Sequence, residues 1–150
     1  MAYPYTEIGL DYIYLEDGYT IHKTPYGEGI SIANTEGLHR AIGKWLISLP
    51  KPLTGAELRF LRVEMDITQR NLAAILGTSE QTLSLWERNR KKAMPGSPDR
   101  LLRALYGDYT KEGGSVRGML ERLAELDQIK QPDKACWHET RRGWQLATAL

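Results

Sequence analysis

The sequence predicts a mainly α protein: a five-helix domain with a small N-terminal α+β domain before it and a short C-terminal β-hairpin after it. Three observations support this fold class. Residues 1–33 are predicted to form strands and turns, because Tyr12–Leu15 and Tyr19–His22 alternate with the period of two that is typical of strands. Residues 54–126 repeat apolar side chains at helical spacing between glycine, serine and proline breaks. Residues 136–148 return to a strand-like composition around a turn.

Prolines mark the first boundary along the chain. Pro50 and Pro52 end the N-terminal part and make a stiff connector, because proline fixes its own backbone angle. We therefore expect three parts: an N-terminal domain at residues 1–50, a helical domain at residues 51–107, and an extension at residues 108–150 that holds the last helix and the hairpin.

The N-terminal part is predicted to begin with strands. Tyr12–Leu15 and Tyr19–His22 are rich in β-formers, and Glu16–Gly18 between them ends in the Asp-Gly pair that favours a hairpin turn. A second turn is expected at Pro25–Gly27, and a short strand at Gly29–Ile32. These segments predict a β-hairpin.

A helix is predicted at residues 35–47, after an N-cap at Asn34 or Thr35. Its apolar stripe would hold Leu38, Ile42, Trp45 and Leu46. The helical domain then opens at Thr54, because Glu57 three residues later completes a capping-box pattern.

The next two helices lie on either side of Gly77. One starts near Thr68 and ends at Gly77, and the next is capped by Ser79. Two helices joined by a short turn containing glycine are the helix-turn-helix signature. A fourth helix is expected at residues 99–106, with Leu101, Leu102 and Leu105 inward, and a fifth at residues 116–126.

The helix at residues 79–90 is predicted to have two different faces. Leu83 and Trp86 share the inward face, and the opposite face carries Gln81, Ser84, Leu85 and Arg88. Glutamine can form two hydrogen bonds to adenine, arginine can do so to guanine, and an apolar side chain can contact a thymine methyl group. These four residues are therefore the candidates for reading base edges in the major groove of DNA.

Other residues around this helix are candidates for contacts with DNA phosphates: Thr68, Gln69, Thr82, Asn89, Arg90, Lys91 and Lys92. Residues 54–106 carry nine Lys or Arg and six Asp or Glu, so the middle of the chain is its basic part. Two alternatives remain. The basic cluster can be a solvated helix end, and Gln69 can act as a cap, alone or together with a phosphate contact. Glu87 is interpreted either as a partner of Arg62 or as an exposed carboxylate.

Several functional classes find no support. The N-terminus lacks the basic start and apolar run of a signal peptide, and no segment approaches the roughly 20 apolar residues that span a bilayer. The single cysteine, Cys136, allows no intramolecular disulfide. We expect a cytoplasmic protein without a cofactor or bound metal. No phosphate loop, nucleophile elbow or spaced His-Glu pair is present, so we expect no enzyme.

The helical residues resemble the Xre/Cro-type helix-turn-helix family. The resemblance spans about 50 residues and rests on Leu61, Arg62, Thr68, Gln69, Leu72, Ala73, Leu76, Gly77, Ser79, Thr82, Leu83, Trp86 and Glu87. It implies a homodimer that reads two half-sites about one DNA turn apart. Within that family, the order of the domains resembles antitoxins of the MqsA type (YgiT type), and Tyr5–Leu15 looks like a related N-terminal segment.

One property of those antitoxins does not carry over. They bind structural zinc through paired cysteines in the N-terminal domain, whereas residues 1–50 contain no cysteine. A closed zinc site needs four ligands, which His22 and His39 cannot supply. No zinc site is therefore expected in this chain.

Three functional hypotheses follow. The first is a sequence-specific DNA-binding regulator, a repressor, that inserts the helix 79–90 into the major groove of a double-stranded operator as a homodimer. The second is an antitoxin of a type II toxin–antitoxin system, which neutralises a protein toxin through its N-terminal domain and regulates its own operon. The tyrosines of residues 1–30 can form such a protein-binding surface or can pack the sheet. The third is a ligand-sensing regulator, for which the sequence singles out no pocket residues.

Overall fold

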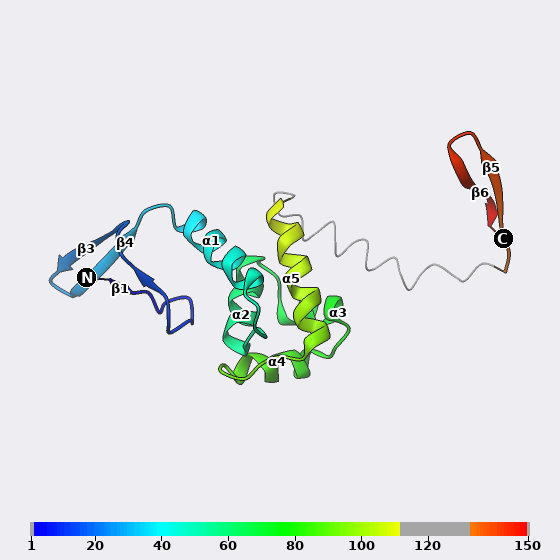
Figure 1. Ribbon diagram of the computed structural model, residues 1–150. Helices are drawn as coiled ribbons and strands as arrows, with labels where there is room; N and C mark the ends of the chain where they lie inside the picture. The colour runs from blue at the N-terminus through cyan, green and yellow to red at the C-terminus, as the bar shows by residue number, and fades with distance from the viewer. Residues whose placement is uncertain (1, 112–132, 150) are drawn as a thin grey trace. The chain divides into compact units, whose positions relative to one another are not determined.

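The computed structural model describes residues 2–111 and 133–149 of the 150-residue chain. The chain divides into two units, residues 1–116 and residues 117–150. Among the described residues, the first unit has four strands and five helices, and the second has one hairpin (Figure 1). The last helix predicted from the sequence, at residues 116–126 in the extension, lies outside the described residues.

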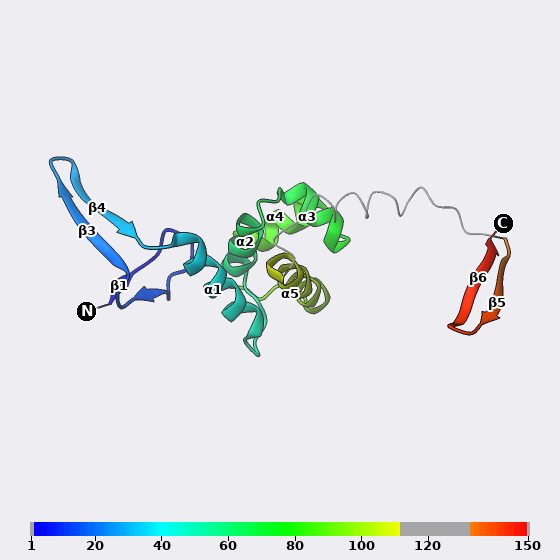
Figure 2. The ribbon, with the colours of Figure 1, turned by 90° about the horizontal axis from the view of Figure 1, so that it is seen from above.

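The five helices are connected by short turns (Figures 1 and 2). They are α1 (Thr35–Ser48), α2 (Gly55–Glu64), α3 (Gln69–Leu76), α4 (Glu80–Arg88) and α5 (Gly96–Lys111). The starts of α1 and α2 follow the local sequence as predicted. Asn34 caps α1 by accepting the backbone N–H of Gly37 at 3.2 Å. Thr54 and Glu57 form the predicted capping box of α2, in which each side chain accepts the backbone N–H of the other residue.

The start of α5 differs from the prediction. The sequence placed it at Asp99, after a break at Pro95–Pro98, but the helix begins at Gly96 and continues to Lys111. Pro98 falls within its first turn, where the missing N–H has no helical partner to lose. Of the predicted break at Pro95–Pro98, only Pro95 therefore lies before the helix.

The core of the first unit lies where these helices meet. Its fully buried leucines are Leu46, Leu53, Leu58, Leu61, Leu72, Leu83 and Leu102. Two residues predicted to face inward are instead exposed, Trp45 at 46% and Leu101 at 44%. The inward stripes of α1 and α5 are narrower than predicted, because Ile42 with Leu46 and Leu102 with Leu105 already fill the space between these helices.

The helix α1 packs against α2 and α5, which follow it in the chain. Gly43 of α1 makes the approach close, since an added Cβ would lie 2.1 Å from the hydroxyl oxygen of Tyr106 on α5. Tyr106 is 1% exposed, and burial raises the pKa of its hydroxyl to about 12. The predicted boundary at residue 50 thus falls between two helices in contact, and the division into three domains stays a prediction.

The strand pairing corrects the N-terminal prediction. Four strands form two antiparallel pairs: β1 (Tyr3–Pro4) with β2 (Tyr14–Leu15), and β3 (Tyr19–Thr24) with β4 (Gly27–Ile32). The hairpin predicted through Asp17 and Gly18 is wrong, because the segment before this turn pairs with β1. The β3–β4 ladder has six residue pairs, more than a four-residue strand before Gly18 could offer. This hairpin extends away from the helices in both views (Figures 1 and 2).

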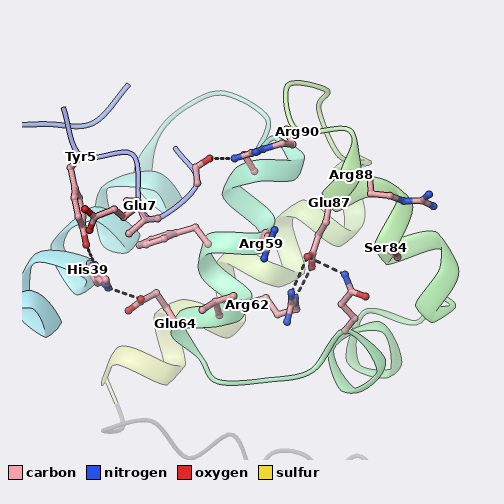
Figure 3. A pocket seen from close by; sticks show the side chains of 16 residues that line it. Tyr5, Glu7, His39, Arg59, Arg62, Glu64, Ser84, Glu87, Arg88 and Arg90 are labelled. Atoms are coloured by element: carbon pink, nitrogen blue, oxygen red, sulfur yellow. Dashed lines mark hydrogen bonds and ion pairs between the residues drawn. The ribbon is translucent and has the colours of Figure 1, made fainter. Parts of the chain in front are cut away.

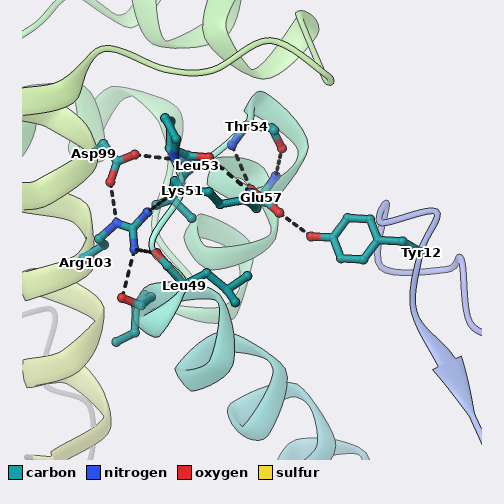
Figure 4. A network of polar contacts seen from close by, with 10 residues as sticks. Tyr12, Leu49, Lys51, Leu53, Thr54, Glu57, Asp99 and Arg103 are labelled. Atoms are coloured by element: carbon teal, nitrogen blue, oxygen red, sulfur yellow. Dashed lines mark hydrogen bonds and ion pairs between the residues drawn. The ribbon is translucent and has the colours of Figure 1, made fainter.

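A polar clamp on α5 fixes the connection between α1 and α2 (Figure 4). Arg103 donates to the backbone carbonyls of Ile47 at 3.0 Å and Leu49 at 2.8 Å, and also to that of Lys51. The buried carboxylate of Asp99 accepts hydrogen bonds from the Arg103 Nε and from the backbone N–H of Leu53, each within 2.7 Å. The clamp satisfies carbonyls at the end of α1 that have no helical partner.

The second unit is the predicted C-terminal hairpin, β5 (Ala135–Thr140) with β6 (Gly143–Ala149). Its turn repeats the hydrogen bonds of the β3–β4 turn. Thr140 Oγ1 donates to the carbonyl of Gly143 at 2.7 Å, as Thr24 Oγ1 does to that of Gly27. Both glycines have positive φ, which suits a residue without a Cβ. No helix in the described parts of the chain is long and apolar enough to cross a membrane.

Candidate nucleic-acid interface

The helix α4 has the two faces that the sequence predicts. Leu83 is fully buried, whereas Leu85 two residues later is 48% exposed. Gln81 and Arg88 are exposed beside Leu85, and Ser84 is half-buried. The outward direction of Leu85 is therefore confirmed.

The turn between α3 and α4 fixes the angle of α4. Thr68 caps α3 by accepting the N–H of Asn71 at 3.1 Å, and Ser79 caps α4 by accepting that of Thr82 at 3.1 Å. Gly77 between the helices has φ 73°, the left-handed conformation that ends a helix. Ala73 on α3 is 2% exposed, which agrees with a small side chain where α3 and α4 pack together. The cap at Ser79 and the helix end at Gly77 were predicted from the sequence. The alternative of Gln69 as a cap is wrong, because Thr68 caps α3 and Gln69 is its first helical residue.

Glu87 holds the inward face of α4 in place (Figure 3). It is 6% exposed and accepts hydrogen bonds from Arg62 Nε at 2.6 Å and Arg62 Nη2 at 3.0 Å. Gln69 Nε2 also donates to this carboxylate, at 3.2 Å. The interpretation of Glu87 as a partner of Arg62 is confirmed, and the exposed-carboxylate alternative is wrong.

The start of α2 lies close to the C-terminal end of α4 at Gly55. A Cβ at this position would lie 2.0 Å from the backbone oxygen of Trp86 and 2.7 Å from that of Asn89. The backbone N–H of Gly55 donates to the carbonyl of Lys92, and that of Ala56 to the carbonyl of Arg90, each at 3.1 Å. These two hydrogen bonds hold the basic segment Arg90–Lys92, which follows α4, against the start of α2. Sequence reasoning missed Gly55; the signal was a poor helix former in the first turn of a well-capped helix.

The comparison with protein families agrees with this geometry. Residues 58–104, from within α2 to within α5, match the family model described as Helix-turn-helix. These residues are a helix-turn-helix domain of the Xre/Cro type. A helix-turn-helix domain supports a role in DNA-binding transcriptional regulation in general. The comparisons with curated proteins and with solved structures gave no significant match.

The basic cluster of the helix-turn-helix domain lies at the C-terminal end of α4. Arg88, Asn89, Arg90, Lys91 and Lys92 are all exposed. Arg90 also contacts the N-terminal segment, because its Nη2 donates to the carbonyl of Gly9 at 2.8 Å. This contact joins residues that are 81 positions apart, and the sequence did not predict it.

The other predicted phosphate candidates lie on the same two helices of the domain. Thr68 is exposed at the start of α3, and Gln69 beside it is half-buried. Thr82 is half-buried, and its hydroxyl oxygen accepts a hydrogen bond from Ser79 Oγ at 2.8 Å. Gln69 donates one amide N–H to Glu87, and the amide nitrogen has a second N–H.

A second network joins the domain to the N-terminal segment (Figure 4). Glu57, which is 1% exposed, accepts hydrogen bonds from Lys51 Nζ at 2.6 Å and from the Tyr12 hydroxyl. Burial and the bond to Glu57 raise the pKa of Tyr12. For Glu57 itself, burial acts to raise the pKa, but hydrogen bonds from Lys51, Tyr12 and Thr54 outweigh burial and lower it. The carboxylate is therefore held in its charged form.

Among the residues that the structure describes, no three His, Cys, Asp or Glu side chains gather closely enough to hold a metal ion.

Proposed function

We propose that the protein is a sequence-specific regulator, a repressor, that binds a double-stranded DNA operator as a homodimer with α4 in the major groove. The observation that carries this proposal is the exposure of Leu85, at 48%, on a helix whose opposite face is locked by Leu83 and Glu87. About half of this leucine is left uncovered between Gln81 and Arg88, and a thymine methyl group would give that part an apolar partner.

The proposal divides the interface into two classes of contact. Gln81, Ser84, Leu85 and Arg88 meet base edges. Phosphates are contacted by Thr68, Gln69, Thr82, Asn89, Arg90, Lys91 and Lys92. Support for the second class comes from the exposure of the basic cluster and from the unused N–H of the Gln69 amide. Glu87 keeps that amide at the start of α3, where free backbone N–H groups also favour a phosphate.

Selection of bound sites from random double-stranded DNA tests the proposal. We expect one enriched motif, a palindrome whose half-site centres lie about 10 bp apart, because two copies of α4 read the two halves. No enrichment at low salt would exclude sequence-specific binding, and a single half-site would exclude the dimer. A reporter whose promoter overlaps the selected motif tests repression, since expression should fall when the protein is present.

A role as an antitoxin is the second candidate, and exposed aromatic side chains favour it. Tyr14 is 60% exposed, and Tyr26 at the tip of the β3–β4 hairpin is fully exposed. Tyrosine is enriched where proteins bind each other. If a reading frame beside this one encodes a toxin, co-expression should rescue growth, and Tyr14→Ser with Tyr26→Ser should weaken the rescue while leaving operator binding intact. Unchanged rescue in the double variant would exclude this surface.

A further inference from the structure

An open cavity of about 770 Å³ lies between the N-terminal segment, α2 and α4 (Figure 3). Tyr5 and Glu7 lie at one side of it, Ser84 and Arg88 lie at the other, and Arg59 lies between them. Its volume falls within the roughly 300–1,000 Å³ that is usual for small-molecule sites. Because Ser84 and Arg88 also belong to the proposed base-reading face, the cavity adjoins the DNA interface.

The charges around the cavity favour an anion. Two of its acidic groups already have hydrogen-bond partners, but only Glu87 has a permanently charged one, Arg62, since Glu64 contacts the imidazole of His39 at 2.8 Å. Arg59 and Arg88 also line the cavity, and neither has a hydrogen bond or ion pair within the described parts of the chain. A guanidinium group presents planar, paired N–H donors that match phosphate and carboxylate oxygens.

Two further charged residues of the lining have opposite effects on an anion in the cavity: Arg90 attracts it and Glu7 repels it. Arg90 lines the same cavity and uses its Nη2 to hold Gly9, but it keeps its positive charge. Glu7 is exposed on the opposite side and is the one carboxylate of the lining without a hydrogen bond or ion pair in the described structure. With His39 neutral, the lining carries four arginines and three carboxylates, an excess of one positive charge. A ligand with two negative charges would pair with both Arg59 and Arg88, the two arginines without a partner in the described structure.

The cavity also has an apolar part. Ile8, Phe60 and Val63 line it beside the charged groups, and Val63 is 55% exposed. Covering apolar surface of this kind is favourable by about 25 cal/mol per Å². A ligand that carries an apolar body next to its anionic group would use both parts of the wall, whereas an inorganic ion would use only one.

We propose that this cavity binds a small organic dianion, a phosphate ester or a dicarboxylate with an apolar body, and that the bound ligand competes with DNA. Arg59 holds the anionic group from α2, and Arg88, whose side chain points away from Arg59 in Figure 3, turns towards it from α4. A ligand in this position withdraws Arg88 and Ser84 from base edges, so the regulator releases its operator when the ligand is present. The competition rests on the proposed DNA-binding function, but the binding of the ligand does not.

Calorimetric titration of the full chain without DNA tests the binding itself. The probes are phenyl phosphate and phthalate, with neutral benzyl alcohol as the uncharged reference. We expect one of the two dianions to bind at least about tenfold more tightly than benzyl alcohol, and its identity distinguishes a phosphate from a dicarboxylate site. Arg59→Gln should weaken that binding about tenfold or more, because a charge-assisted hydrogen bond is lost. Arg100→Gln removes an exposed arginine outside the cavity and should change nothing.

A second variant changes the affinity in the opposite direction. Glu7→Gln removes the opposing carboxylate, so it should tighten binding of the dianion several-fold, an increase that a misfolded protein could not show. If neither dianion binds better than benzyl alcohol, the proposed site does not exist. If Arg59→Gln binds as tightly as the wild type, the ligand lies elsewhere and the assignment of this cavity is wrong.

Operator binding measured at constant ionic strength tests the competition. The dianion should weaken operator binding by the wild type and should have about tenfold less effect, at equal concentration, on Arg59→Gln. Ligand binding without any effect on the operator would overturn the competition. Failure to select an operator would remove the proposed function, while the titration without DNA would still decide whether the cavity binds its ligand.

Discussion

Glu87 on α4 accepts two hydrogen bonds from Arg62 on α2, one from Nε at 2.6 Å and one from Nη2 at 3.0 Å. The same arginine donates its Nη1 to the carbonyl of Ile67 at 3.0 Å, in the turn before α3. One guanidinium group therefore connects α2, the turn before α3, and α4. The orientation of α4, the proposed DNA-reading helix, depends on this connection as well as on the apolar core.

Removing the carboxylate should destabilise the fold. Glu87→Ala leaves Arg62 largely buried without its ionic partner, which costs about 3–5 kcal/mol in comparable buried pairs. Unfolding by urea measures the loss, and Glu80→Ala, an exposed glutamate in the first turn of α4, serves as the matched control with an expected loss below about 1 kcal/mol. Equal effects of the two substitutions would show that the pair does not hold α4.

Leu83 and Leu85 should respond to truncation in opposite ways. Leu83→Ala empties a fully buried site and should lower the free energy of unfolding by about 2–5 kcal/mol. Leu85→Ala should lower it by less than about 1 kcal/mol, because the side chain is half exposed, but should weaken operator binding. Urea unfolding and operator titration of both variants check this. A large stability loss for Leu85→Ala with unchanged operator affinity would exclude it from the reading surface.

Arg88 and Lys92 should separate base reading from phosphate binding. Arg88→Ala should cost about 1–3 kcal/mol of operator affinity and relax the preference at one base pair. Lys92→Ala should weaken binding to all sequences alike and reduce the salt dependence by about one unit of slope. Affinities for a set of single-base operator variants at several salt concentrations measure both effects. If both substitutions weaken all variants uniformly, the base-reading role of Arg88 is wrong.

The lowered pKa of Glu57 predicts a loss of stability in acid. Because the unfolded chain takes up the proton at a higher pH, near 4.5, the folded state gains stability from this group at any pH above that value. The contribution disappears as the pH falls from there through the lower folded-state pKa. Glu57→Gln should therefore unfold with a weaker pH dependence in this range than the wild type, as measured by urea midpoints. Glu28→Gln, at an exposed position on β4, should keep the dependence of the wild type.

Local chemistry explains which parts of the fold could be predicted. The caps at Asn34, Thr54, Thr68 and Ser79 follow from side chains that bond backbone groups within three residues, and each is present in the structure. Helical spacing likewise placed Leu83 inside and Leu85 outside. The pairing of β2 with β1 could not be predicted in this way. The Asp-Gly pair indicates a turn, but it does not indicate whether β2 pairs with the strand after the turn or with β1.

The candidate site shows the same division. The sequence indicated the residues of the exposed face of α4, because helical spacing places them on one side. It also indicated Arg62 as the partner of Glu87, because the two side chains have opposite charges. It gave no sign of the Gly9–Arg90 contact or of the cavity beside it, and a glycine in the first turn of α2 did not show what Gly55 approaches. Each of these depends on segments more than 30 residues apart, and their distance is decided by how the whole unit packs.

The amino-acid sequence by itself determined the helices, their caps, the two faces of α4 and the helix-turn-helix pattern, because these depend on neighbours within about one helical turn. Only the tertiary structure decided that the N-terminal segment lies against α2 and the end of α4. That arrangement depends on long-range contacts, including Tyr12 with Glu57 and Arg90 with Gly9. These contacts leave no periodic signal in the chain, because each joins two single residues whose separation is set by the packed core.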